Sequence, residues 1–172
     1  MLKIVITGPE SSGKTTLATA LAVHYQEPLV PEFAREYLDN LGRPYIEDDL
    51  LHIAAGQSFS EDKGLASART MVICDTDMLT LRIWSNVKYG QFNKRINPLW
   101  FDALPNLYLV CAPDLPWEPD PQREDPDDRE MLFDMYITEI ERAKVNYAVI
   151  KGEDRTNTAI RLLDGFLEKV SK

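Results

Sequence analysis

Cysteine and histidine are scarce in this sequence, which has two of each among its 172 residues. Cys74 and Cys111 both end short apolar runs, which is typical of buried free thiols and gives no sign of a disulfide framework. His24 and His52 have no further cysteine or histidine beside them at the spacing of zinc ligands. The shortage therefore argues against a disulfide-rich secreted fold and against a zinc centre.

A long apolar run and an excess of positive charge are also missing. No run approaches the length of a membrane span, and the first residues, MLKIVITGPE, lack the layout of a signal peptide. Acidic residues outnumber basic residues by 28 to 19, and the net charge is -9. Proteins that bind nucleic acid usually present a basic face. We therefore expect a cytoplasmic protein whose partners include neither membranes nor nucleic acid.

The pattern of apolar residues predicts an α/β fold in a single domain that covers residues 1–172. Short apolar runs predict strands at 2–7, 28–31, 71–75, 107–111 and 147–150. Helical periodicity predicts helices at 15–25, 33–42, 47–68, 77–87, 129–144 and 156–170, with Gly56 as a candidate break in the third. Residues 90–106 are predicted to form an irregular connection. Strands that alternate with helices indicate a parallel sheet covered on both faces.

The stretch GPESSGKTT, residues 8–16, fits the phosphate-binding pattern G-x-x-x-x-G-K-[ST] between a strand and a helix. Glycine allows the backbone conformations that turn amides toward a phosphate, and the helix N-terminus adds partial positive charge. Lys14 is expected to reach the β- and γ-phosphates and Thr15 to bind Mg²⁺. The alternative is a plain glycine–serine turn. We predict ATP and Mg²⁺ as cofactors. The residues expected to hold the nucleotide are Gly8, Glu10, Ser11, Ser12, Gly13, Lys14, Thr15 and Thr16.

Two other nucleotide-binding classes do not fit the sequence. A GTPase needs N-K-x-D to read its base, but Asn93 and Lys94 are followed by Arg95 and Ile96. A dinucleotide-binding fold needs G-x-G-x-x-G, which Gly8-Pro9-Glu10 does not supply. A small kinase or an ATP-driven switch remains.

Carboxylates at the ends of two predicted strands are candidates for the chemistry. Asp75 and Asp77 lie in ICDTD, where the carboxyl end of a strand faces the ligand crevice of an open α/β sheet. Asp75 is a candidate Mg²⁺ ligand. Asp77 either contacts substrate or caps the following helix. Glu32, in PEFAREY, could accept a proton from a substrate hydroxyl, and Arg35 could pair with Glu32 or bind substrate. The alternative for both is a solvated helix start.

The segment at about 113–128 is rich in proline and charge, and a kinase would place a lid there. Arg123 and Arg129 are the candidates to neutralise charge on the transferred phosphoryl group. A solvated acidic loop is the alternative. The stretch GEDRTNTA, residues 152–159, either holds the adenine or forms a turn in which Thr156 caps the last helix.

Six segments occur in order: GPESSGKTTLA, PEFAREY, IAAGQ, ICDTD, IWSNVKYG, and LYLVC with PDLPWEPDPQRED. Together they resemble the ribosylnicotinamide kinase domain of the NadR family. The resemblance covers nearly the whole chain. It implies a P-loop NTPase fold with strand order 2-3-1-4-5, and ATP-dependent phosphorylation of the 5′-hydroxyl of nicotinamide riboside.

The resemblance also assigns roles by position. Residues 8–16 would hold ATP, Glu32 and Arg35 would face the riboside, Asp75 and Asp77 would serve Mg²⁺ and the substrate, and Arg123 and Arg129 would belong to the lid. The H-x-G-H signature of the NadR adenylyltransferase domain is absent. Where family members place an aromatic residue to stack on nicotinamide, this sequence has Pro31, with Phe33 or Phe59 as substitutes. A kinase for another nucleoside or small metabolite, and a nucleotide-dependent binding module without an acceptor, stay open.

Overall fold

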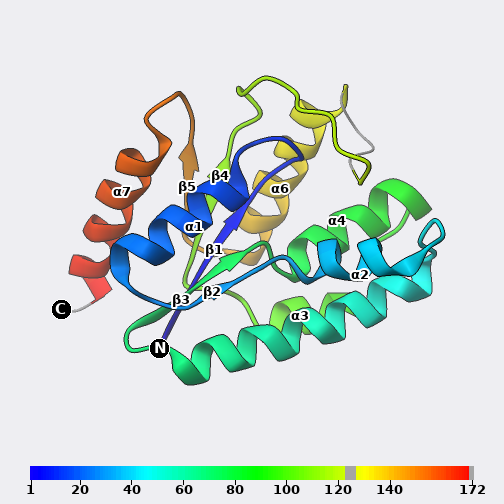
Figure 1. The fold of residues 1–172 in the computed structure, drawn as a ribbon, viewed down its shortest axis with the longest axis horizontal. Helices are drawn as coiled ribbons and strands as arrows, with labels where there is room; N and C mark the ends of the chain where they lie inside the picture. Colours follow the sequence, from blue (N-terminus) through cyan, green and yellow to red (C-terminus); the bar gives the residue numbers. More distant parts are fainter. Residues whose placement is uncertain (123–126, 171–172) are drawn as a thin grey trace.

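The computed structural model describes residues 1–122 and 127–170. Its centre is a five-stranded sheet in the order β2-β3-β1-β4-β5 (Figure 1), and each neighbouring pair is parallel. The strands are β1 (Leu2–Thr7), β2 (Leu29–Val30), β3 (Met71–Asp75), β4 (Leu107–Cys111) and β5 (Tyr147–Ile150). This topology confirms the predicted α/β P-loop fold and the strand order that the family resemblance implied.

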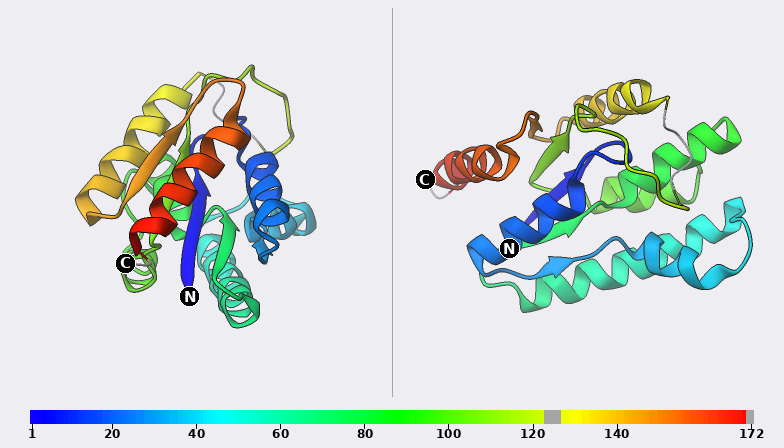
Figure 2. Two further views of the ribbon diagram at one scale, coloured as in Figure 1. Left: turned by 90° about the vertical axis from the view of Figure 1, so that its left-hand side faces the viewer. Right: turned by 45° about the horizontal axis from the view of Figure 1, so that its top comes forward.

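Helices cover both faces of the sheet (Figure 2). They are α1 (Lys14–Tyr25), α2 (Phe33–Leu41), α3 (Glu47–Ser67), α4 (Met78–Tyr89), α5 (Ile96–Asp102), α6 (Arg129–Ala143) and α7 (Arg155–Val170). Side chains alternate along a strand, so Ile4 and Ile6 of β1 pack with α1 and α7, whereas Val5 packs with α3, α4 and α6. All three side chains are fully buried. The apolar runs thus form the middle layer of a three-layer domain.

Helix α3 continues through Gly56, so the candidate break at that residue is wrong. The glycine serves close packing: a Cβ atom built on Gly56 would lie 2.1 Å from Cε1 of Phe33. Absence of a side chain lets α2 approach α3, and the two helices lie alongside each other (Figure 1). Tertiary packing here outweighs the low helix propensity of glycine.

The connection at 90–106 is not irregular throughout, because it contains α5. Asn93 lies in the turn before this helix, and its Oδ1 accepts hydrogen bonds from the backbone N–H of Arg95, at 2.9 Å, and of Ile96, at 3.4 Å. Pro98 lies in the first helical turn, where a missing backbone donor costs nothing. Trp100 is 1% exposed and anchors the helix to the core.

Residues 113–122 form neither helix nor strand, as the prolines predicted. Arg123 lies outside the described residues. Among residues 1–122 and 127–170, no helix is both long and apolar enough to cross a membrane.

Candidate active site

The predicted phosphate loop connects β1 to α1. Gly8, Ser11 and Gly13 have φ angles of 132°, 52° and 78°, in the region that favours glycine. A Cβ atom on Gly8 would lie 2.5 Å from the carbonyl oxygen of Cys111, so the loop requires glycine there. Left-handed residues within such a loop turn backbone amides to one side, which makes an anion-binding concavity.

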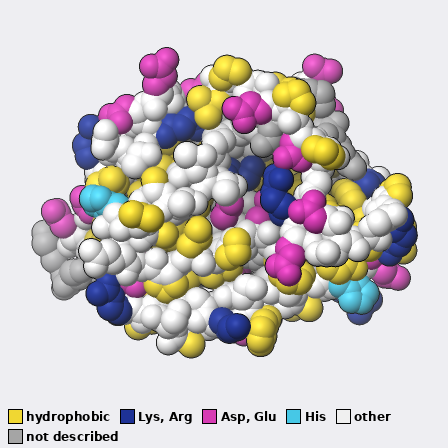
Figure 3. All heavy atoms as spheres, in the orientation of Figure 1, with side chains coloured by type: hydrophobic (Ala, Val, Ile, Leu, Met, Phe, Trp, Pro, Cys, Tyr) yellow, Lys and Arg dark blue, Asp and Glu magenta, His cyan; other side chains and the backbone are white. Residues whose placement is uncertain are grey.

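The loop forms one wall of a pocket of about 460 Å³. Figure 3 shows a hollow near the centre of this face with acidic and basic side chains at its border. Residues 8–17 line the pocket, so all the predicted nucleotide-holding residues lie in its wall. The other walls come from α2, α4, α6, α7 and the segment after β4. These walls include Glu32, Arg35, Thr80, Trp84, Leu115, Tyr136 and Arg155.

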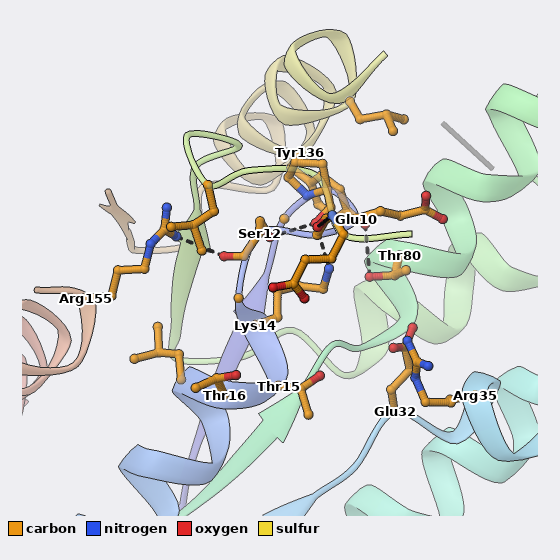
Figure 4. Close-up of a pocket in the computed structure, with 18 of the residues that line it drawn as sticks. Glu10, Ser12, Lys14, Thr15, Thr16, Glu32, Arg35, Thr80, Tyr136 and Arg155 are labelled. Atoms are coloured by element: carbon orange, nitrogen blue, oxygen red, sulfur yellow. Dashed lines mark hydrogen bonds between the residues drawn. The ribbon is translucent and has the colours of Figure 1, made fainter. Parts of the chain in front are cut away.

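Polar side chains of the loop fold back onto the carbonyl oxygen of Pro9. Lys14 Nζ donates to it at 2.8 Å and Ser12 Oγ at 2.7 Å. Figure 4 shows Lys14 curled against the loop in this way. The ammonium group therefore already lies beside the concavity, with a neutral oxygen as its partner.

Asp75 is the last residue of β3 and is 3% exposed. Burial raises the pKa of its carboxyl, although a hydrogen bond from Thr15 acts in the opposite direction. Its Oδ1 atom is buried and has no hydrogen-bond partner among the described residues. Mg²⁺ prefers oxygen ligands, and usually combines one or two protein oxygens with water and phosphate. The hydroxyl of Thr15 and the orphaned oxygen of Asp75 fit that ion.

Glu32 precedes α2, and Figure 4 shows it together with Arg35 on the side of the pocket opposite Thr16. Desolvation raises the pKa of the Glu32 carboxyl, and the charges of Asp75 and Glu10 add to the increase. Lys14 and Arg35 act in the opposite direction without cancelling it. A carboxylate with a raised pKa is a better proton acceptor than a solvated one.

Arg35 is partly exposed. Its guanidinium forms an ion pair with the carboxylate of Asp120, in the segment after β4, with an N–O distance of 2.9 Å. Gln122 of the same segment donates to the carbonyl oxygen of Arg35 at 3.3 Å and to Asp39 Oδ1 at 2.5 Å. This segment therefore contacts α2 on one side of the pocket.

The same segment also contacts the phosphate loop. The backbone N–H of Glu118 donates to Ser11 Oγ at 2.9 Å. Arg129, the first residue of α6, donates to the carbonyl oxygen of Leu115 at 2.9 Å and, more weakly, to that of Ser11 at 3.4 Å. Its guanidinium carbon lies 5.7 Å from the ring centre of Trp117. Arg129 thus lies beside the loop, while Arg123 is not among the described residues.

Asp77 does not face the pocket, so the assignment of a substrate contact is corrected. It is 2% exposed and caps α4, where its Oδ1 accepts from the backbone N–H of Leu79 at 3.1 Å. Its Oδ2 accepts from the hydroxyl of Tyr108 at 2.5 Å, and that hydroxyl accepts from Trp100 Nε1 at 2.8 Å. Thr76 has a φ of 66°, and this left-handed turn separates the two aspartates. The capping alternative is the correct one.

Arg155 is a site residue that the sequence analysis missed. It is 7% exposed, donates to the carbonyl oxygens of Ser12 at 2.9 Å and Ala112 at 3.1 Å, and pairs with Asp114. It therefore ties the last helix to the phosphate loop. In the sequence, Arg155 comes shortly after the strand that forms β5, at the carboxyl edge of the sheet, which is a position typical of site residues. No local sequence pattern distinguishes it from a surface arginine.

Helix α7 begins at Arg155, so Thr156 lies in its first turn and does not cap it. The residue before the helix is Asp154, whose carboxylate accepts from Asn157 Nδ2 at 2.7 Å. Thr156 lines the pocket instead. Thr80 and Tyr136 were also missed; their hydroxyls are 3.2 Å apart, and both lie inside helices where no sequence signal marks them.

The sequence profile of a family described as AAA domain matches residues 3–156, which is most of the chain. The chain belongs to this AAA domain family. The chain is also 23% identical over 169 residues to the trifunctional NAD biosynthesis/regulator protein NadR of Escherichia coli, and 22% identical to NadR of Salmonella typhimurium. Each alignment covers 94% of this chain but 41% of the relative, so the chain spans less than half the length of these proteins.

Solved structures show the same fold. A NadR protein in complex with NR has a TM-score of 0.84 at 20% identity, covering 94% of this chain and 50% of the other. Thymidylate kinase from Ehrlichia chaffeensis has a TM-score of 0.69 at 18% identity, covering 96% and 98%. These similarities confirm the resemblance of the chain to NadR and show that it has the P-loop fold of these proteins.

Proposed function

We propose that this protein is a kinase that transfers the γ-phosphoryl group of ATP to an alcohol of a small molecule. The observation that carries the proposal is one pocket that holds the phosphate loop on one wall and Glu32 on another. Lys14 and Thr15 are matched to the phosphate chain, and Glu32 is a desolvated carboxylate on the side where an acceptor would enter. A binding module without an acceptor has no use for that carboxylate.

Each site residue then has a role. Lys14 exchanges the carbonyl oxygen of Pro9 for the phosphates, which are stronger acceptors because they are charged. Thr15 and Asp75 would hold Mg²⁺, which would supply positive charge to neutralise the phosphates of the nucleotide. Glu32 orients the acceptor hydroxyl and takes its proton as the oxygen attacks.

The segment at about 113–128 serves as the lid in this proposal, since it already bridges the phosphate loop and α2. Arg129, and Arg123 from the part that is not described, stabilise the transferred group when the lid is closed. Residues 1–172 form one kinase domain.

For the acceptor we propose nicotinamide riboside, phosphorylated at its 5′-hydroxyl to nicotinamide mononucleotide. The support is the NadR resemblance over most of the chain and a NadR structure solved in complex with NR. Family members place an aromatic residue at the position of Pro31. Phe33 packs against Gly56 and Phe59 is 65% exposed, so we do not propose either of them as its substitute. Trp84 lines the pocket and supplies an aromatic face for the base.

The test is an ADP-release assay with Mg-ATP and a panel of acceptors: nicotinamide riboside, the common nucleosides, and thymidine monophosphate because of the thymidylate kinase similarity. Mass spectrometry identifies the product. Turnover with nicotinamide riboside is expected, and turnover with a different acceptor alone would reject that substrate. Nucleotide binding without any phosphorylated product would reject the kinase and favour the binding module. Lys14→Ala, which should lose nucleotide binding in either case, controls for a contaminating kinase.

A further inference from the structure

The motif IAAGQ, residues 53–57, lies in the middle of α3 and has no part in the pocket wall. Its last residue, Gln57, is 3% exposed, although a buried amide must find several hydrogen-bond partners. Its Oε1 accepts from the backbone N–H of Phe33 at 3.0 Å. Phe33 directly follows Glu32 and is the first residue of α2. An N–H at that position has no partner within its own helix, so Gln57 supplies the acceptor that the helix start lacks.

The amide nitrogen of Gln57 reaches a second part of the site. Its Nε2 lies 3.5 Å from the carbonyl oxygen of Thr76, the left-handed residue that follows Asp75. One side chain from α3 therefore contacts the segment that carries Glu32 and the segment that carries Asp75. These two segments follow different strands and are more than forty residues apart in the sequence.

A buried ion pair holds Gln57 in this orientation. Nε2 of Gln57 donates to Glu61 Oε1 at 3.2 Å, one helical turn away. The other carboxylate oxygen of Glu61 accepts from Lys3 Nζ at 2.5 Å, and Lys3 also donates to the carbonyl oxygen of Ala103 at 3.1 Å. Since the carboxylate accepts, the amide must present its nitrogen to Glu61 and its oxygen to Phe33. The orientation of the amide is thus determined by the charge beside it.

From this geometry we infer that Gln57 is a positioning residue that fixes the Glu32 carboxylate relative to Asp75. The inference rests on the proposed kinase function, in which Glu32 meets the acceptor and Asp75 belongs to the metal site. Gly56 contributes from the same turn of α3, because its missing side chain provides the space for the ring of Phe33. Glu32 lies directly before the start of α2, and in a catalytic site a displacement of about 1 Å can reduce turnover about a hundred-fold.

The test compares Gln57→Met and Gln57→Asn with Asn93→Leu. Methionine keeps the length of the side chain and removes its hydrogen bonds, and asparagine keeps the amide but is too short to reach Phe33. Asn93 is a matched control: it is a buried amide that also joins two elements, donating to Glu47 Oε1 at 2.9 Å, and it lies outside the pocket wall. Loss of either amide should reduce stability.

The first measurement does not depend on activity. Hydrogen exchange of the Phe33 amide, followed by NMR, should accelerate at least about ten-fold in both Gln57 variants and stay unchanged in Asn93→Leu. The second measurement separates kcat from nucleotide binding. Both Gln57 variants should lose about 10- to 100-fold in kcat while the Kd for Mg-ATP stays within about two-fold, and Asn93→Leu should keep kcat.

Unchanged exchange at Phe33, or a wild-type kcat in a folded Gln57 variant, would overturn the inference. So would an equal fall of kcat in Asn93→Leu, because destabilisation alone would then explain the result. A wild-type protein that turns over no acceptor refutes the proposed function instead, and the amide exchange still decides whether Gln57 holds the start of α2. If Gln57→Met does not fold, Gln57→Asn, which keeps the polar amide on a side chain one methylene shorter, gives both measurements.

Discussion

Replacing Glu32 with glutamine should change activity and stability in opposite directions. The substitution keeps the size of the side chain and removes its charge. In the folded protein the pKa of Glu32 is raised, because desolvation and the charges of Asp75 and Glu10 disfavour the ionised form more than Lys14 and Arg35 favour it. The pocket thus disfavours the ionised form of Glu32, and a carboxylate with a raised pKa is a better proton acceptor than a solvated one.

The effect on stability follows from proton linkage. A carboxyl whose pKa is higher in the folded state than in the unfolded state contributes stability below its unfolded pKa, and this contribution is lost as the pH rises through the folded pKa. Once the pH is above the folded pKa, each unit of the difference between the two pKa values costs about 1.4 kcal/mol of the free energy of unfolding. Glutamine does not titrate, so Glu32→Gln should be more stable than the wild type at neutral pH, and this advantage should disappear in acid.

The effect on activity is expected to be large. Loss of a general base typically reduces kcat by about 10²- to 10⁴-fold, which corresponds to roughly 3 to 5 kcal/mol of transition-state stabilisation. The acid limb of the pH–rate profile, in which wild-type activity rises as Glu32 loses its proton, should be absent in the variant. Glu36→Gln is the matched control, because Glu36 lies one turn along α2 and is exposed.

Urea unfolding at about pH 7 and pH 4, together with kcat measured across that range, checks both expectations. A variant that keeps wild-type kcat would show that Glu32 is not the base. A variant that is less stable than the wild type at neutral pH would show that the carboxylate stabilises the fold, which contradicts the raised pKa.

Three further substitutions test other parts of the site and its support. Gly8→Ala places a Cβ atom 2.5 Å from the carbonyl oxygen of Cys111, at a φ of 132°. Calorimetry should therefore show at least a roughly ten-fold loss of Mg-ATP affinity. A variant that binds Mg-ATP normally would disprove the loop geometry. Asp75→Asn should weaken the response of kcat to Mg²⁺ in a metal titration, and an unaltered titration would place the metal elsewhere. Glu61→Ala leaves the ammonium of Lys3 buried without its partner and should cost about 3 to 5 kcal/mol in urea unfolding; a loss below about 1 kcal/mol would mean that water reaches Lys3.

The parts of the site that could be predicted from sequence are those in which one short segment determines its own shape. The phosphate loop is such a case, because its glycines, lysine and threonine are neighbours in the chain and the flanking strand and helix have clear patterns. The positions of Glu32 and Asp75 follow from the same logic, since the carboxyl ends of parallel strands meet at one edge of the sheet. Their roles in catalysis remain predictions that the kinetic experiments above address.

The parts that could not be predicted depend on contacts between distant segments. Asp77 occupies a strand-end position like that of Asp75, and its burial becomes evident only when Tyr108 and Trp100 are seen to meet it from β4 and α5. Gly56 has the composition of a helix break, and only the ring of Phe33 explains why the helix continues. Composition and periodicity describe one element at a time and carry no information about such pairs.

The lysine and arginine side chains around the pocket have different hydrogen-bond partners. These partners indicate which cations could move to a triphosphate and which ones support the fold. Lys14 and Arg129 donate to neutral carbonyl oxygens in the described structure. Arg35 and Arg155 each pair with a carboxylate. A charged phosphate attracts a cation by Coulomb forces that a neutral carbonyl oxygen does not supply. If a triphosphate binds as proposed, we expect Lys14 and Arg129 to leave their present partners more readily than the two arginines that already pair with a carboxylate. Because Arg129 also holds the segment after β4, its transfer to a phosphate would couple nucleotide binding to the position of that segment over the loop.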